Sequence, residues 1–388
     1  MATSVFDAAV LGLGSMGAFA CLELARRGLA VAGFDRFAPP HGRGSHNGAT
    51  RVFRTSYAEH PDYVPLALRA GALWDRLGEQ AGNIFLHRCG MLSLGPGASA
   101  LIEGTRTSAT LHGLDLEELS PARLRSRFPA FAPPSGWTAL FEPAAGWVDV
   151  DGAMRFALQE AARASVDVRL NTSVEGWDER GGGFRITTSA GEFVAKRLVI
   201  TAGAWTQGLL AELQLPIRIL RKALVWVDPL RPEHFAPGVF PVFASADKFF
   251  YGFPNIGSAG VKVAIHWTET ASAGNPAYPL PEPGPDEIGS VLEAAAELIP
   301  SLAGRLPGAL ERVTDSRSCL YCMTPDEHFI LDRHPQHENV WFAAGFSGHG
   351  FKFAPAIGEA LADMALRGKT ELPVGFLSLK RLTSRNSR

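Results

Sequence analysis

The chain has little cysteine and almost no net charge, and each shortage excludes a class of protein. Only 4 of its 388 residues are cysteine, so no disulfide framework replaces an ordinary hydrophobic core. The formal net charge is −2, whereas a nucleic-acid-binding protein usually has a strong basic excess. Charged residues make up 20% and hydrophobic residues 46% of the chain, as in ordinary globular proteins. We therefore expect no nucleic-acid partner, and the sparse cysteines fit a reducing, cytoplasmic compartment.

Long hydrophobic runs are also missing. No stretch reaches the roughly 18 uncharged apolar residues that a membrane span needs. Segment 1–29 is apolar enough to resemble a signal peptide. However, no Lys or Arg comes before its apolar run, and Asp7 interrupts that run. No amphipathic segment with a basic face is present either. We expect no attachment to a membrane.

What is present is the pattern of a multidomain α/β protein. At about 150 residues per domain the length suggests two or three domains. The chain begins with a predicted βαβ unit: a strand over Val5–Leu11, a helix over 15–27 and a strand over Leu29–Phe34. Further apolar periodicity predicts four helices and two short strands, with a proline-rich linker over 276–285. The helices are expected over 62–80, 151–164, 286–298 and 354–367, and the strands over 329–331 and 340–342.

A glycine fingerprint lies inside the first βαβ unit. Gly12, Gly14 and Gly17 form G-x-G-x-x-G between strand and helix, and Asp35 ends the next strand. In this motif the glycines allow a tight turn, a close approach to a pyrophosphate and close helix packing, and the acidic residue accepts hydrogen bonds from a ribose. The alternative is a glycine-rich turn without a ligand. The motif suits FAD or NAD, and the Gly/His-rich loop 38–50 that follows favours FAD.

Several segments together resemble the monomeric sarcosine oxidase and N-methyltryptophan oxidase family. Their order and spacing agree along nearly the whole chain. They are the loop Gly44–Arg54, the turn Thr201–Trp205, the segment Ser318–Tyr321, the Asp326–Phe329 turn and the signature Gly345–Phe353.

The resemblance implies an α/β (α+β) fold of two interleaved domains. A Rossmann-like FAD-binding domain would comprise residues 1–84, 142–216 and 322–388. A mixed antiparallel-sheet substrate domain would comprise residues 85–141 and 217–321.

The resemblance also implies an activity. Such enzymes are FAD-dependent oxidases of secondary amino acids, N-methyl or cyclic, that form an imine and reduce O2 to H2O2; formaldehyde is released from N-methyl substrates. The expected partners are a small amine substrate and O2, and a monomer is expected. Alternatives are an amine dehydrogenase or demethylase with another acceptor, an oxidase of glycated amino acids, a nicotinamide dehydrogenase and a non-catalytic dinucleotide-binding protein.

The residues that would contact FAD follow from the matched segments. The amides at residues 348–350 precede the last long helix and would face the flavin pyrimidine oxygen. The full expected set is Gly12, Gly14, Ser15, Met16, Gly17, Asp35, Arg36, Ser45, His46, Thr50, Arg51, Val174, Gly203, Trp205, Cys319, Phe346, Gly348, His349, Gly350, Phe351 and Lys352.

Cys319 and Cys322 form a C-x-x-C pair that allows several interpretations. A zinc site would need two more ligands at suitable spacing, and a thioredoxin-like pair lacks its usual context, so we expect no metal. Two buried thiols are the structural alternative. The resemblance makes Cys319 a thioether link to the flavin, and Cys322 is expected to pack.

The resemblance also assigns the amine chemistry to residues of this chain. Lys262 would activate oxygen, although the solvent face of an alternating strand is the alternative. Arg54 and Lys352 would bind the substrate carboxylate, with a surface arginine as the alternative for Arg54. Arg51 and His46 match positions beside the flavin, where a cation near the pyrimidine end would stabilise the reduced form. The side chains expected to line the substrate cavity are His266, Tyr251 and Tyr321.

Some positions do not decide which amine is the substrate. Asn47 and Ala49 stand where the family's loop is expected to have histidine and aspartate. Glu59 matches a loop position near the site, with a solvated carboxylate as the alternative. Val242 and Phe243 lie where cavity-lining side chains fall. Four aromatic residues would line a larger cavity unless they belong to the core: Phe249, Phe250, Trp267 and Trp341.

Overall fold

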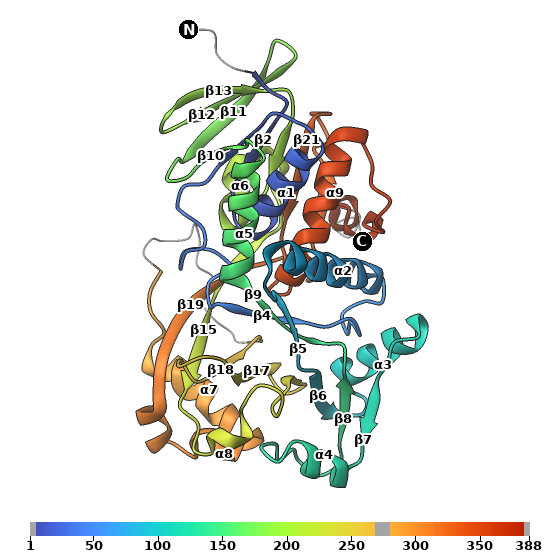
Figure 1. Ribbon diagram of the computed structural model, residues 1–388, viewed down its shortest axis with the longest axis vertical. Coiled ribbons are helices and arrows are strands. Elements are labelled where there is room, and N and C mark those ends of the chain that lie inside the picture. Colours follow the sequence, from blue (N-terminus) through green and yellow to red (C-terminus); the bar gives the residue numbers. More distant parts are fainter. Residues whose placement is uncertain (1–4, 268–279, 384–388) are drawn as a thin grey trace.

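The computed structural model describes residues 5–267 and 280–383. Figure 1 shows an elongated molecule with one sheet system in its upper half and another in its lower half. The α/β class, with a Rossmann-like half and a mixed-sheet half, confirms the expected fold. No helix in these ranges is both long and apolar enough to cross a bilayer.

The upper half is built on a six-stranded sheet whose first five strands are parallel. In order across the sheet the strands are β10 (Asp167–Arg169), β3 (Val31–Phe34), β2 (Ala8–Leu11), β14 (Leu198–Ile200), β21 (Val340–Ala344) and the antiparallel β20 (Ile330–Arg333).

The parallel strands are short and buried on both faces. In β2, Ala8 and Val10 pack against helices α1 (Ser15–Arg26), α5 (Val150–Arg163) and α9 (Ala354–Arg367). Ala9 and Leu11 face the opposite side. That side is covered by a second sheet in the order β1 (Val5–Phe6), β13 (Gly191–Ala195), β12 (Gly183–Thr188) and β11 (Val174–Arg180). Burial on both faces explains the nearly unbroken apolar sequence of these strands.

The single strand predicted over Val5–Leu11 is wrong, because β1 and β2 belong to different sheets. Asp7 separates them. Its carboxylate accepts a hydrogen bond from the Ala30 amide at 3.1 Å and pairs with Lys196 Nζ at 2.8 Å. A charged side chain with these partners cannot occupy a position that is buried on both faces.

The lower half contains an eight-stranded sheet, antiparallel except where β16 runs parallel to β6. Its order is β19 (Val313–Met323), β15 (Arg218–Val227), β18 (Val261–Ile265), β17 (Phe250–Asn255), β16 (Val242–Ser245), β6 (Met91–Pro96), β8 (Trp137–Glu142) and β7 (Glu117–Leu119). The helices of this half are α3 (Ala100–His112), α4 (Pro121–Arg127), α7 (Pro285–Leu298) and α8 (Pro300–Ala303).

Smaller elements connect the halves. A three-stranded sheet of β4 (Thr50–Phe53), β9 (Gly146–Asp149) and β5 (Leu86–Arg88) lies beside α2 (Tyr63–Ala81) in Figure 1. The remaining short helices are η1 (Gly203–Trp205), α6 (Thr206–Leu209), η2 (Ala211–Leu213), η3 (Pro232–His234), η4 (Gly308–Arg312), η5 (Phe351–Phe353), η6 (Gly375–Leu377) and α10 (Lys380–Thr383).

The four helices predicted from apolar periodicity are α2, α5, α7 and α9, each with ends within one residue of the expected bounds. Of the predicted linker, residues 276–279 lie outside the described residues, and 280–284 are irregular. The domain borders stay a prediction, although the strands of the eight-stranded sheet do come from two separate stretches of chain.

Two glycines let α1 approach its neighbours closely. A Cβ at Gly17 would lie 1.8 Å from the Gly12 carbonyl oxygen, and one at Gly358 would lie 2.7 Å from the Phe19 backbone carbon. Gly358 therefore sets the spacing between α9 and α1, the helix that carries the fingerprint. A helical glycine elsewhere, Gly289 in α7, has no such neighbour, because the nearest atom to its Cβ would be 3.8 Å away.

These two helical glycines make a matched test. Gly358→Ala should lower the free energy of unfolding by about 1–3 kcal/mol, because the methyl group forces two packed helices apart. Gly289→Ala should raise it by up to about 1 kcal/mol, because alanine favours the helix. Urea unfolding of both variants checks this; equal effects would mean that the α1–α9 spacing is not constrained at Gly358.

Candidate active site

A cavity of about 650 Å³ lies at the carboxyl ends of the parallel strands. One end is formed by Gly12, Gly14 and Asp35, and the other by Tyr321 and Gly348. Open α/β sheets bind ligands in this crevice, outside the carboxyl ends of the strands. The cavity therefore leads from the fingerprint to the C-terminal signature.

The fingerprint end has the features of an anion site. Gly12 has φ of +98°, and a Cβ there would lie 2.7 Å from Ala202 Cα. Gly14 caps α1 without a side chain, so the first amides of the helix are left for a ligand. Asp35 also holds the loop: its two carboxylate oxygens accept hydrogen bonds from the Leu13 and Phe37 amides, both at 2.8 Å.

Most residues expected to contact the cofactor line this cavity. The exceptions are Gly17, which packs under the turn, and a group that lines a second, smaller cavity: Thr50, Cys319, His349 and Lys352. Those lining the large cavity are Gly12, Gly14, Ser15, Met16, Asp35, Arg36, Ser45, His46, Arg51, Val174, Gly203, Trp205, Phe346, Gly348, Gly350 and Phe351.

The smaller cavity, of about 60 Å³, adjoins the larger one. Arg51, Tyr321, Gly348 and Phe351 line both, so a molecule in the small cavity faces the end of a group in the large one. Its other lining residues include the expected Arg54, Tyr251, His266, Cys319 and Lys352. The small cavity is therefore suited to a small molecule, and it lies next to the end of the large cavity that is far from the glycine fingerprint.

A buried arginine dominates one wall of the small cavity. Arg54 is 4% exposed, and its Nη2 lies 2.6 Å from both carboxylate oxygens of Glu59. Burial favours the neutral form of Glu59, but the Arg54 cation outweighs it and holds the pKa of that carboxyl at about 2. Within the described parts of the chain, no acceptor reaches the buried Nη1 of Arg54. Glu59 is therefore an ion-pair partner in the site rather than a solvated loop residue.

Lys352 lies on another wall of the small cavity. Its Nζ donates hydrogen bonds to the His349 carbonyl oxygen at 2.7 Å and to Tyr57 Oη at 3.3 Å. Burial lowers the pKa of the Lys352 ammonium well below its ordinary value, and the Arg54 cation lowers it further. Two cationic side chains thus converge where a ligand carboxylate would relieve their repulsion.

Lys262 is buried on a strand whose residues are all buried, which excludes the solvent-face interpretation. Its Nζ donates to the carbonyl oxygens of Gly48 at 2.8 Å and Thr50 at 2.9 Å, and to Thr50 Oγ1 at 2.6 Å. Burial, and then the nearby Arg51 cation, lowers the pKa of the Lys262 ammonium well below its ordinary value. It lies 4.2 Å from the centroid of the Phe253 ring.

The loop before β4 holds a second cation in the same way. Arg51 donates from Nη2 to the carbonyl oxygens of Ser45 and Asn47, both at 2.7 Å, and from Nη1 to that of Thr50 at 2.7 Å. The loop turns these oxygens inward through two successive left-handed residues, Gly48 with φ of +107° and Ala49 with φ of +62°.

The two cysteines of the C-x-x-C pair belong to different apolar clusters, and both approach this loop at Ser45. Cys319 Sγ is 3.4 Å from Arg51 Nη2 and 3.5 Å from the Ser45 carbonyl oxygen. Cys322, expected only to pack, lines the large cavity, 4.0 Å from Ser45 Oγ. Asn47 ties the loop to β19 through a hydrogen bond to the Ser318 carbonyl oxygen at 2.8 Å. In the residues that the structure describes, no three His, Cys, Asp or Glu side chains gather as metal ligands.

Four residues expected at the substrate cavity form its aromatic wall: Tyr251, Tyr321, His266 and Phe249. Tyr251 and Tyr321 place their hydroxyl oxygens 3.3 Å apart, and the His266 ring packs 5.1 Å from that of Tyr321. Burial lowers the pKa of His266 to about 4, so the imidazole is neutral. Phe249 lines the cavity in a left-handed conformation, with φ of +47°.

Several aromatic and apolar side chains lie elsewhere than expected. Val242, Phe243, Phe250 and Trp341 pack in hydrophobic cores, and Trp267 is 48% exposed. The side chains that take their place in the cavity wall are Met91, Leu224, Ala244 and Phe253. Strand alternation around Ala244, together with the parallel pairing of β16 with β6, brings Ala244 and Met91 to one wall.

Comparison with known proteins decides the family. The profile described as FAD dependent oxidoreductase matches residues 7–364. The chain belongs to the FAD-dependent oxidoreductase family.

Relatives and solved structures agree with this assignment. The family member described here is 35% identical to monomeric sarcosine oxidase of Bacillus sp. (strain B-0618) over 381 residues, 97% of this chain and 96% of the relative. It is 34% identical to N-methyl-L-tryptophan oxidase of Yersinia pestis (strain Pestoides F) over 384 residues, 97% and 99% of the two chains. The structure of glycine oxidase from Geobacillus kaustophilus superposes with a TM-score of 0.80 at 23% identity, covering 98% of this chain and 99% of that one.

The buried histidines of this oxidoreductase predict acid sensitivity. Burial lowers the pKa of His46 and His349 to about 3 and that of His266 to about 4, all below the ordinary value of 6.5. Below pH 6.5 these histidines bind protons in the unfolded chain but stay neutral in the folded chain. The histidines therefore do not lower the free energy of unfolding above pH 6.5. As the pH drops from 6.5 toward 4, this free energy falls by up to about 1.4 kcal/mol per pH unit for each histidine.

Urea unfolding of the flavin-loaded protein between pH 7.5 and 4.5 measures this slope. His266→Gln should make the slope shallower, whereas His60→Gln, at a side chain that is 44% exposed, serves as the control. An unchanged slope in His266→Gln would contradict a buried neutral imidazole.

Proposed function

We propose that this protein oxidises small secondary amino acids, N-methyl or cyclic, to imines, and passes the electrons through FAD to O2 to form H2O2. The observation that carries the proposal is the buried, unsatisfied Nη1 of Arg54 beside Lys352, in an aromatic cavity that shares a wall with the dinucleotide cavity. FAD, when bound, accepts two electrons and a proton from the C–H bond next to the amine nitrogen, and the carbon–nitrogen bond becomes the double bond of the imine. The uncapped start of α1 and the large cavity of about 650 Å³ beside it fit this cofactor.

The chain's own residues would bind and prepare the substrate. Arg54 and Lys352 would hold its carboxylate through charge-assisted hydrogen bonds. Amine oxidation needs a neutral amine, and buried cations near the bound amine lower its pKa. The neutral His266 and the two tyrosines Tyr251 and Tyr321 would surround the amine and exclude water.

The size of the cavity narrows the substrate class. At about 60 Å³ it suits an amino acid with a small side chain better than one with an indole ring. The relatives named above include both a sarcosine oxidase and an N-methyl-L-tryptophan oxidase. We infer a substrate nearer to sarcosine in size, and a monomeric enzyme as the name of the first relative indicates.

The oxidation balances without a further reactant. The amine loses two electrons and two protons and becomes an imine; O2 gains two electrons and two protons and becomes H2O2. Water then hydrolyses the imine, and an N-methyl group leaves as formaldehyde. We propose that the protonated form of the buried Lys262 stabilises the negative charge that develops on O2 during its reduction.

The two half-reactions test the function and the role of Lys262 together. Anaerobic mixing with sarcosine should bleach the yellow flavin, and admitted O2 should restore the colour with one H2O2 per turn. Lys262→Met should slow the recolouring at least 100-fold and the bleaching less than tenfold. Flavin that no N-methyl or cyclic amino acid bleaches would refute the function, and equal slowing of both phases would refute the role of Lys262.

A covalent flavin link through Cys319 is also proposed, because this residue lines the small cavity and its Sγ lies 3.4 Å from Arg51, which lines both cavities. Acid precipitation of the wild-type protein should leave the yellow colour with the protein. Cys319→Ser should release the flavin into solution. Cys322→Ser is the matched control, since this thiol lines the flavin cavity and should leave the link intact; release by both variants would argue against Cys319.

A further inference from the structure

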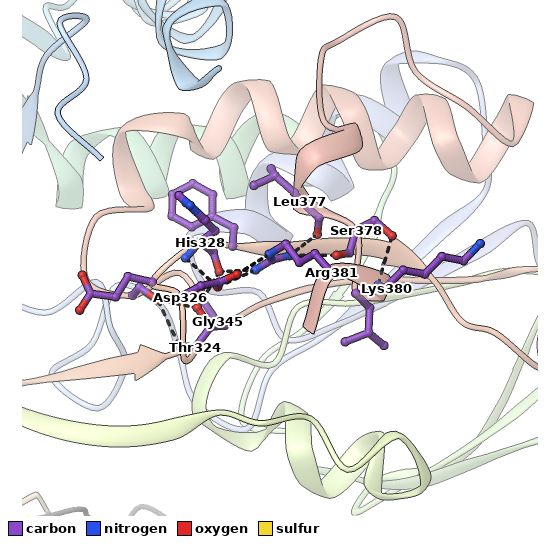
Figure 2. A network of polar contacts seen from close by, with 12 residues as sticks. Thr324, Asp326, His328, Gly345, Leu377, Ser378, Lys380 and Arg381 are labelled. Atoms are coloured by element: carbon purple, nitrogen blue, oxygen red, sulfur yellow. Dashed lines mark hydrogen bonds and ion pairs between the residues drawn. The ribbon is translucent and has the colours of Figure 1, made fainter. Parts of the chain in front are cut away.

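Arg381 in α10 connects the C-terminal segment to a turn that borders the site. Its Nε and Nη2 donate to the two oxygens of Asp326 at 3.0 and 3.2 Å, and Nη2 also donates to the His328 carbonyl oxygen at 2.7 Å. Its Nη1 donates to the carbonyl oxygens of Leu377 and Ser378 at 2.9 and 3.1 Å. Figure 2 shows this network from close by, with the guanidinium between the turn and the C-terminal segment. The ion pair is sheltered: the two side chains are 18% and 7% exposed.

The turn that Arg381 holds is a strained one. Glu327 has φ of +60°, which a residue with a side chain adopts at an energetic cost. The turn is closed by hydrogen bonds from the Glu327 amide to the Thr324 carbonyl oxygen and from Thr324 Oγ1 to that of His328 at 2.7 Å. Because the bidentate Arg381–Asp326 pair spans the same turn, it keeps Glu327 in this conformation.

The Glu327 carbonyl oxygen faces the site. It accepts a hydrogen bond from His349 Nε2 at 2.9 Å, so the proton of this neutral imidazole is on Nε2. His349 Nδ1 is then the acceptor for the Tyr57 hydroxyl, at 2.5 Å. The Tyr57 oxygen in turn accepts a hydrogen bond from Lys352 Nζ. An unbroken series of contacts therefore joins Arg381 to the ammonium of Lys352.

The same segment touches the other side of the site. Phe376 in η6 packs 4.9 Å from the Tyr63 ring, and Tyr63 packs 4.7 Å from the Tyr57 ring. Phe376 also stacks with His60, the neighbour of Glu59, at 5.9 Å. The C-terminal segment thus supports both loops that carry the carboxylate-binding side chains.

We propose that Arg381 is a positioning residue for carboxylate binding: by fixing the Glu327 turn, it sets the His349 tautomer and, through Tyr57, the place of the Lys352 ammonium. This rests on the part of the proposed function that assigns the substrate carboxylate to Lys352. It does not depend on the oxidation step.

Binding of acetate to the flavin-loaded protein, followed by the change in flavin absorbance, tests the proposal without turnover. Arg381→Met should raise the acetate dissociation constant at least tenfold and should raise KM for sarcosine more than it lowers kcat, with unchanged flavin content. Arg381→Lys should recover part of the affinity. Arg312→Met is the matched control: it removes a comparable cluster of bonds to Asp228 and Pro229 in the lower half, and should bind acetate like the wild type.

A double-mutant cycle tests the route. Tyr57→Phe should also weaken acetate binding, and adding Arg381→Met to it should change the dissociation constant less than twofold. Asp326→Asn replaces Arg381→Met if the latter fails to fold. Three results would each overturn the proposal. Arg381→Met could bind acetate as tightly as the wild type, or the wild type could fail to bind acetate. The double variant could also raise the dissociation constant by the product of the two single-variant factors. A wild type that binds acetate but oxidises no amine would instead reject the oxidation alone.

Discussion

The site depends on the way one loop satisfies two cations, the half-buried Arg51 and the buried Lys262, with neutral groups. Among the residues that the structure describes, both donate to the carbonyl oxygens of Ser45, Asn47, Gly48 and Thr50, and neither forms an ion pair with a carboxylate. Burying an ammonium without partners would be prohibitive, but a paired carboxylate would cancel its charge. Carbonyl dipoles supply the hydrogen bonds and leave the positive charge uncancelled. Arg51 therefore brings an uncancelled positive charge to the wall that the two cavities share, which suits a substrate carboxylate, a reduced flavin and reduced oxygen.

Arg54 differs from Arg51 and Lys262 in its hydrogen-bond partner. It has a carboxylate partner, Glu59, yet only one of its two terminal nitrogens is engaged. Its pairing keeps the arginine in place on a loop, and the remaining nitrogen stays available to a ligand. One guanidinium can therefore pair with Glu59 through one nitrogen and bind a ligand through the other, because its donors point in fixed directions.

Much of this could be predicted from local patterns. The glycine spacing and the short apolar strands identified the dinucleotide half, and the 3.6-residue periodicity identified α2, α5 and α9 there and α7 in the lower half. What failed depended on partners distant in sequence. Asp7 splits a strand because of Lys196, and Ala244 reaches the cavity because β16 pairs with β6. For Lys262, alternation alone left a solvent-facing position open, because it cannot reveal that both faces of β18 are covered. Arg381 carried no signal, since its role depends on a turn more than fifty residues earlier.

The wall of the large cavity is assembled from residues between Leu11 and Phe351 that lie far apart in the sequence, within 11–51, 172–219, 320–322 and 343–351. A ribosome-bound chain that has only its βαβ unit thus offers the pyrophosphate-binding amides but nothing to hold the isoalloxazine ring. Capture of the flavin must wait until almost the whole polypeptide has been synthesised and its last long helix has docked. Cofactor loading is therefore a late step in the maturation of this protein, and a truncated chain would be released without its colour.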